Sequence, residues 1–138
     1  MNLSGMRSMI VIDTHIWIWW VNQNTDKLKP HWIEMIQSTS NAYISSISLF
    51  EVSWLVHHGR IEIMLPLDEW LTEATDGSGI GIVPISPKIA MTATQLPYHH
   101  RDPQDRLIIA SAIATKSHLI SADSIFPQYQ EIADILIN

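Results

Sequence analysis

The 138-residue sequence contains no cysteine, which excludes a disulfide framework, a thiol nucleophile and a Cys-ligated metal. Charged residues are also scarce, at 16%, and acids outnumber bases by 14 to 8. The net charge of −6 argues against broad non-specific binding of nucleic acid, although a divalent cation would offset acidity at a local site. No apolar run is long enough to span a bilayer, so we expect no membrane segment. The absence of cysteine fits a reducing compartment, and we expect a cytoplasmic protein.

The length favours a single domain with a core of ordinary size. No internal repeat, low-complexity tract or linker divides the chain. We expect residues 1–8 to form a flexible N-terminal extension, with Met9 as an alternative start, and residues 9–138 to form the folded domain.

Short apolar runs alternate with helical stretches, a pattern typical of the α/β class with a mostly parallel central sheet flanked by helices. Strands are expected at residues 9–13, 42–45, 81–85, 119–121 and 134–137. Helices are expected at residues 14–21, 30–38, 48–56, 68–74, 86–95 and 102–116.

Four acidic residues lie where expected strands end or expected helices begin: Asp13, Glu51, Asp105 and Asp123. Parallel strands would bring them together at the carboxyl edge of one sheet, where open α/β folds place ligands. Converging carboxylates repel one another unless a cation joins them or their pKa values rise. The pattern therefore indicates a site for a divalent metal.

Each acid also has an ordinary structural interpretation. Asp13 and Asp123 are placed to cap a helix and a turn, and Glu51 matches the N3 position of a capping box. Asp102 precedes Pro103 as an N-cap, and Asp105 gains from the helix dipole. Caps explain any one acid, but they do not explain why four acids share the same edge.

Four segments carry a family resemblance. They are IVIDTH at residues 10–15, SSISLFEV at 45–52 (followed by GRI at 59–61), LPYHHRDPQDRL at 96–107 and LISAD at 119–123. In order and spacing they resemble the motifs of the PIN-domain family, and within it the VapC-like toxins of bacterial type II toxin–antitoxin pairs. The resemblance runs from about Met9 to the C-terminus. Gln104 stands where an aromatic residue is common and Ser111 where Gln is common, but neither departure removes an acid.

The resemblance implies a Mg²⁺- or Mn²⁺-dependent endoribonuclease that cleaves RNA phosphodiesters with a metal-activated water, leaving 5′-phosphate and 3′-hydroxyl ends. It assigns the catalytic and metal-binding roles to Asp13, Glu51, Asp105 and Asp123. It also implies a cognate antitoxin as partner and a homodimer. Three further side chains are expected to support the site, namely Thr14, Asp102 and Ser121. Two others, Arg101 and Arg106, are expected to contact a phosphate of the substrate.

Three assignments have competing interpretations. His99 and His100 are interpreted as loop or substrate-side contacts, with a metal or acid–base pair as the alternative. Arg106 is placed either for a phosphate or for a salt bridge to an acid in its own helix turn. Trp17 and Trp20 belong to a core stripe or, alternatively, line a groove for an apolar antitoxin segment.

Three rival functions remain beside the ribonuclease toxin. One is a PIN-type nuclease that acts on DNA or structured nucleic acid outside a toxin–antitoxin system. A second is a non-catalytic acidic binding module. The third is a receiver-like phosphoacceptor domain, which needs paired acids after its first strand and an Asp after its third. Here Asp13 stands alone, and residues 81–85 are followed by Ser86 and Pro87.

Overall fold

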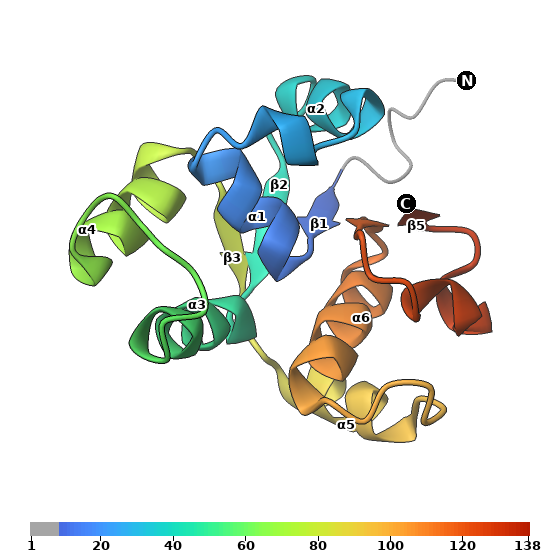
Figure 1. Ribbon diagram of the computed structural model, residues 1–138. Helices are drawn as coiled ribbons and strands as arrows, with labels where there is room; N and C mark the ends of the chain where they lie inside the picture. Colours follow the sequence, from blue (N-terminus) through green and yellow to red (C-terminus); the bar gives the residue numbers. More distant parts are fainter. Residues whose placement is uncertain (1–8) are drawn as a thin grey trace.

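The computed structural model describes residues 9–138, so the extension expected at residues 1–8 lies outside the described part of the chain. Five short parallel strands form one sheet in the order β3-β2-β1-β4-β5 (Figure 1). The strands are β1 (Ile10–Ile12), β2 (Ala42–Ser45), β3 (Gly81–Val83), β4 (His118–Ile120) and β5 (Leu136–Ile137). The predicted α/β class with a parallel central sheet is confirmed.

Six α-helices connect and cover the strands, close to the positions expected from the sequence. They are α1 (Thr14–Val21), α2 (Pro30–Gln37), α3 (Ile47–His57), α4 (Leu67–Thr72), α5 (Pro87–Gln95) and α6 (Pro103–Thr115). Ser86 and Asp102 cap α5 and α6 through their side chains, accepting from the amides of Ile89 and Gln104. The proline that follows each cap sits at the first helical position, where its missing N–H costs nothing.

The capping box expected at the start of α3 is wrong. The helix begins at Ile47, and its N-cap Ser46 makes no side-chain capping bond. Ser48 and Glu51 therefore lie inside the helix, and both side chains bond to Thr14 on α1 instead. The end of the helix agrees with expectation, because Gly59 adopts a left-handed φ of 65° just beyond it.

Side chains alternate between two core clusters, one on each face of the sheet. Ile10 and Ile12 of β1 face a cluster built with α1 to α4, whereas Val11 faces one built with α5, α6 and the C-terminal segment. Alternate residues of a strand point to opposite faces, so a strand that is apolar throughout is buried on both. The three residues of β1 are at most 5% exposed, which makes it the centre of the fold.

Trp17 belongs to the first of these clusters. Its side chain is 0% exposed, its indole N–H donates to the carbonyl of Ala74 at 2.8 Å, and its ring meets Trp70 edge-on at 5.2 Å. Trp17 therefore lines no groove for a partner, which corrects the alternative for this residue; Trp20 lines a hollow of about 350 Å³, so for Trp20 the alternative stays a prediction. Trp20 is only half-buried. Within residues 9–138, no helix is both long and apolar enough to cross a bilayer.

We predict that Trp17→Ala lowers the free energy of unfolding by about 3–5 kcal/mol, because it leaves a large cavity in the core. Urea unfolding followed by far-UV circular dichroism measures the change. Trp54→Ala is the matched control, since that indole is 40% exposed and should cost less than about 1 kcal/mol. Equal losses in the two variants would contradict the central place of Trp17 in the core.

Candidate metal centre

The four predicted acids line one cleft at the carboxyl edge of the sheet. The cleft has a volume of about 350 Å³ and is lined by Asp13, His15, Trp19, Glu51, Asp105, Ala122 and Asp123. Its acids follow β1 and β4 or lie near the start of α3 and α6. The convergence expected from the parallel topology is therefore present. It brings together residues that are far apart in the sequence, such as Asp13 and Asp123.

Asp13 is placed by the pairing of β1 with β4. Ile12 is in register with Ile120, so the residues that follow, Asp13 and Ser121, lie side by side. The Ser121 hydroxyl donates to Asp13 Oδ2 at 2.7 Å, and the Thr14 amide donates to Oδ1 at 2.7 Å. Asp13 is 7% exposed, and this burial raises its pKa despite the two donors. Asp13 therefore caps α1 as expected and also lines the cleft, and its role as a metal ligand stays a prediction.

Glu51 is held by a chain of hydroxyl groups. Thr14 Oγ1 donates to Glu51 Oε1 at 2.8 Å and lies 2.8 Å from Ser48 Oγ. A hydroxyl has a single proton, and that of Thr14 goes to the carboxylate, so the Ser48 hydroxyl donates to Thr14. Burial raises the pKa of Glu51, and the charges of Asp13 and Asp102 raise it further.

Asp105 is the most perturbed acid of the cleft. It lies in the first turn of α6, behind the N-cap Asp102. Burial, followed by the negative charge of Asp13, raises the pKa of Asp105 to about 7, and the nearby His100 opposes this shift. At neutral pH the carboxyl group is thus close to half protonated unless a cation stabilises its charge.

The sequence predicts a loop or substrate-side contact for His100, but its imidazole lies between two of the carboxylates, which favours the alternative of a role at the metal site. Its Nε2 lies 2.9 Å from Asp123 Oδ2 and its Nδ1 lies 3.5 Å from Asp105 Oδ2. Ligand atoms of these three side chains all lie within 4.8 Å of one another, as in a metal-binding group. The adjacent His99 turns the other way and meets the Tyr129 ring edge-on at 4.8 Å. Adjacent residues rarely point the same way, and of these two histidines only His100 faces the carboxylates.

Arg106 does not face the acidic cleft, which corrects both of its expected roles. Its guanidinium is 5% exposed and donates to the carbonyls of Leu96 at 2.7 Å, Pro97 at 2.8 Å and His100 at 3.2 Å. The guanidinium is therefore not accessible to a phosphate of the substrate. Within residues 9–138, it forms no salt bridge. Because Leu96 is the C-cap of α5, the guanidinium also lies at the negative end of that helix dipole.

The remaining expected side chains divide into those near the carboxylates and one outside the cleft. Thr14 and Ser121 bond to the acids directly, and the Asp102 charge acts on Glu51 and Asp105. Arg101 is exposed and lines a separate hollow of about 400 Å³ with Tyr98 and Arg106. Its expected contact with a substrate phosphate stays a prediction.

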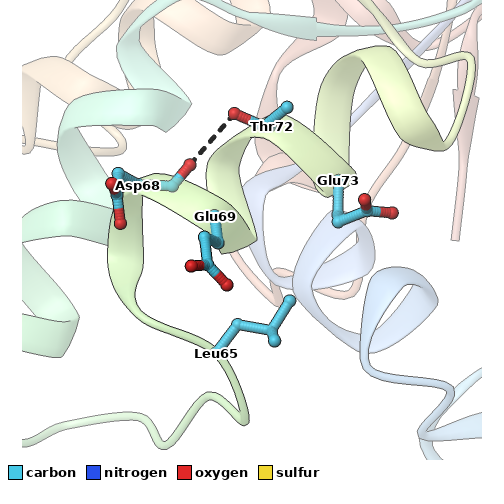
Figure 2. Close-up of a pocket in the computed structure, with 5 residues that line it drawn as sticks. All are labelled: Leu65, Asp68, Glu69, Thr72 and Glu73. Atoms are coloured by element: carbon cyan, nitrogen blue, oxygen red, sulfur yellow. Dashed lines mark hydrogen bonds between the residues drawn. The ribbon is translucent and has the colours of Figure 1, made fainter.

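A larger hollow, of about 470 Å³, lies over α4 and is lined by Leu65, Asp68, Glu69, Thr72 and Glu73 (Figure 2). All five residues are exposed, and the acids are Asp68 and Glu69 in the first turn of α4 and Glu73 in the π-helical turn that follows it. The Thr72 hydroxyl is bonded to the Asp68 carbonyl at 3.1 Å. Solvent screens these exposed carboxylates from one another, so they have little need of a cation. The smaller cleft, with its buried and half-buried acids, is the better candidate for a metal site.

The donor set of the cleft fits a hard divalent cation. Carboxylate oxygens are the ligands that Mg²⁺ and Mn²⁺ favour. Among residues 9–138, His100 is the only basic side chain within 4.0 Å of any of the four carboxylates. Three of these acids have raised pKa values, each with burial as the largest cause. The cleft therefore concentrates negative charge that a cation would neutralise.

Comparison with known proteins identifies the family of the chain. The family model described as "PIN domain" matches residues 10–132. The curated protein "Ribonuclease VapC22" of Mycobacterium tuberculosis (strain ATCC 25618 / H37Rv) is 31% identical over 115 residues, which cover 83% of this chain and 86% of that protein.

Solved structures with the same fold include complexes of toxins with antitoxins. VapBC2 from Rickettsia felis, bound to a DNA fragment from its promoter, matches with a TM-score of 0.70 at 20% identity, covering 94% of this chain and 98% of that one. A toxin–antitoxin complex from Klebsiella pneumoniae matches with a TM-score of 0.56 at 19% identity, covering 94% and 96%. At these identities the likeness establishes the fold.

The raised pKa values predict how the stability of the cation-free protein depends on pH. A carboxyl group with a higher pKa in the folded chain binds more protons there, so stability falls as the pH rises from the unfolded to the folded value. For Asp105 this interval runs from 3.8 to about 7. We expect the melting temperature in EDTA to fall across it, and Asp105→Asn to flatten the fall and raise the melting temperature at neutral pH by on the order of 5 °C.

Differential scanning calorimetry at a series of pH values measures this profile. Asp134→Asn is the control, because Asp134 is exposed and does not line the cleft. Added Mg²⁺ should stabilise the wild type more as the pH rises, since the cation binds the ionised carboxylates. A wild-type protein that grows more stable across the interval in EDTA would contradict the raised pKa values.

Proposed function

The chain belongs to the PIN domain family, and from that premise we propose that it is a metal-dependent endoribonuclease, the toxin of a toxin–antitoxin pair. The observation that carries the proposal is the cleft in which Asp13, Glu51, Asp105 and Asp123 converge. A relative with 31% identity over most of the chain is named as a ribonuclease, which favours RNA over DNA as substrate.

Mg²⁺ or Mn²⁺ fits the cleft, with Asp13 and Asp105 as the most direct ligands and Glu51 and Asp123 binding directly or through water. Such a cation supplies Lewis-acid charge that activates water and stabilises the negative charge developing at the phosphorus and on the leaving oxygen.

The surrounding side chains fix the carboxylates before a cation or an RNA arrives. Ser121 and the Thr14 amide hold both oxygens of Asp13, and the Ser48–Thr14 pair holds Glu51. The hydrogen-bond donors are themselves buried, so water does not compete for them. Carboxylates that are already oriented lose little freedom when they bind a cation, which favours a tight and well-defined site.

We assign the chain a cognate antitoxin as partner, assembly as a homodimer and action in the cytoplasm. The neighbouring solved structures are toxin–antitoxin complexes that share this fold. Several large apolar side chains on and after α3 are exposed, namely Phe50 at 57%, Trp54 at 40%, Met64 at 97% and Leu65 at 39%. A contiguous patch of exposed apolar side chains is typical of a protein interaction surface, and we propose that these four residues contribute to one. They support a protein partner on this side of the molecule.

The proposal predicts that Asp13→Asn and Asp105→Asn each abolish RNA cleavage while the proteins stay folded. Asn keeps the size of the side chain and one acceptor oxygen but removes the charge that binds the cation. We expect a loss of at least about 10³-fold in cleavage rate on a pool of structured RNAs with Mg²⁺ or Mn²⁺. The rate is measured by gel electrophoresis, and EDTA should abolish cleavage by the wild type.

Asp134→Asn serves as the matched control and should cleave like the wild type. A single-stranded RNA and a flap DNA of related sequence, assayed side by side, separate the toxin ribonuclease from a DNA-directed PIN nuclease. Cleavage of the flap DNA in preference to RNA would overturn the proposed substrate. Equal cleavage by the wild type and a folded Asp105→Asn variant would remove this cleft from the mechanism.

A further inference from the structure

His100 lies between two of the four carboxylates of the cleft, at a position that none of the roles proposed so far requires. Nε2 lies 2.9 Å from Asp123 Oδ2, whereas Nδ1 lies 3.5 Å from Asp105 Oδ2. The side chain is 14% exposed, less than either acid, at 18% for Asp105 and 24% for Asp123. The imidazole is therefore packed behind the carboxylates and is not a freely rotating surface group.

The backbone of His100 is fixed independently of its imidazole. The amide donates to the Tyr129 hydroxyl at 2.7 Å, and the carbonyl accepts from Arg106 at 3.2 Å. Tyr129 and Arg106 are both buried. A change of the side chain at this position should consequently leave the course of the loop intact.

The ring itself is held by one further contact and one short hydrogen bond. It meets the buried Phe126 edge-on, with ring centroids 5.6 Å apart. The distance of 2.9 Å to Asp123 is that of a good N–H···O bond, whereas 3.5 Å to Asp105 is long. An ionised carboxylate only accepts, so the ring nitrogen at this short distance must carry an N–H, whichever protonation state the imidazole has. The geometry places this N–H on Nε2, where it donates to Asp123.

The Asp123 carboxylate is held by this bond and by one local backbone bond. It lies in the loop after β4, outside any helix or strand. Its Oδ1 accepts from the Ile125 amide at 2.7 Å, and its Oδ2 accepts from His100. One bond per oxygen fixes the plane of the carboxylate and leaves a lone pair on each oxygen for a cation. Without His100, only the local turn would hold this side chain.

We propose that His100 is a positioning residue of the metal centre: its Nε2–H fixes the Asp123 carboxylate in the orientation that binds the cation. This role rests on the proposed function, because it acts on the same cleft. Loss of a group that orients a metal ligand typically weakens metal binding by roughly 10- to 100-fold. His100 therefore affects cleavage through the cation and not by contact with the reacting phosphate.

Three variants of His100 and one of its neighbour separate this role from a merely structural one. The amide nitrogen of His100→Gln can reach the position of Nε2 and donate to Asp123, whereas that of His100→Asn is too short. His100→Ala removes the donor altogether. His99→Ala is the control, because His99 packs on Tyr129 and lies in the same loop without a bond to the carboxylates.

The experiment measures Mn²⁺ binding by electron paramagnetic resonance without RNA, together with folding by circular dichroism. We expect roughly 10-fold weaker binding or more for the Ala and Asn variants, and no more than about 3-fold weaker binding for Gln and for His99→Ala. With saturating Mn²⁺, RNA cleavage by the Ala variant should recover toward the wild-type rate, because the lesion lies in cation affinity.

Wild-type Mn²⁺ affinity in folded His100→Ala would overturn the proposal, as would equal losses in His100→Gln and His100→Asn. Because that last comparison needs only two polar variants, it decides the matter even if the Ala variant unfolds. A wild type that binds Mn²⁺ but cuts no RNA would refute the proposed function and leave this role to be judged on binding. A wild type that binds no Mn²⁺ would refute both.

Discussion

The structure depends on one electrostatic constraint, the burial of mutually repelling acids at the end of a parallel sheet. Asp13 is 7% exposed at the carboxyl end of the central strand, a position where burial disfavours its charge. The Ser121 hydroxyl and the Thr14 amide reduce this cost without neutralising it. The region around Asp13 is thus electrostatically unsatisfied by the described protein groups. A cation bound in the cleft would reduce this electrostatic cost.

Much of the fold could be predicted because its signals are local. Asp102 and Pro103 mark the start of α6, Gly59 follows the end of α3, and each parallel strand is a short apolar run. The four acids could be placed together because parallel strands end at the same edge. The misread capping box shows where such signals fail. Ser48 and Glu51 have the right spacing for a cap, but both bond to Thr14, a residue 37 positions from Glu51.

The loop between α5 and α6 shows a second limit of the sequence. A guanidinium binds carbonyls and phosphates with similar geometry, so the identity of Arg106 alone does not distinguish a loop contact from a substrate contact. Burial decides between them, and burial depends on the packing of the whole domain. The same loop turns His99 onto Tyr129 and His100 onto the carboxylates. Nothing in the pair of adjacent histidines indicates which of them takes which direction.

The long sequence separation within the cleft bears on the synthesis of the protein. The bond between Ser121 and Asp13 joins residues 108 positions apart, and it forms only when β4 pairs with β1. A growing chain on the ribosome contains Asp13 and Glu51 long before it contains Asp123. Until the last part of the chain is translated, the four acids proposed to bind the cation cannot come together. A nuclease built in this order stays inactive toward the ribosome and the message that are producing it.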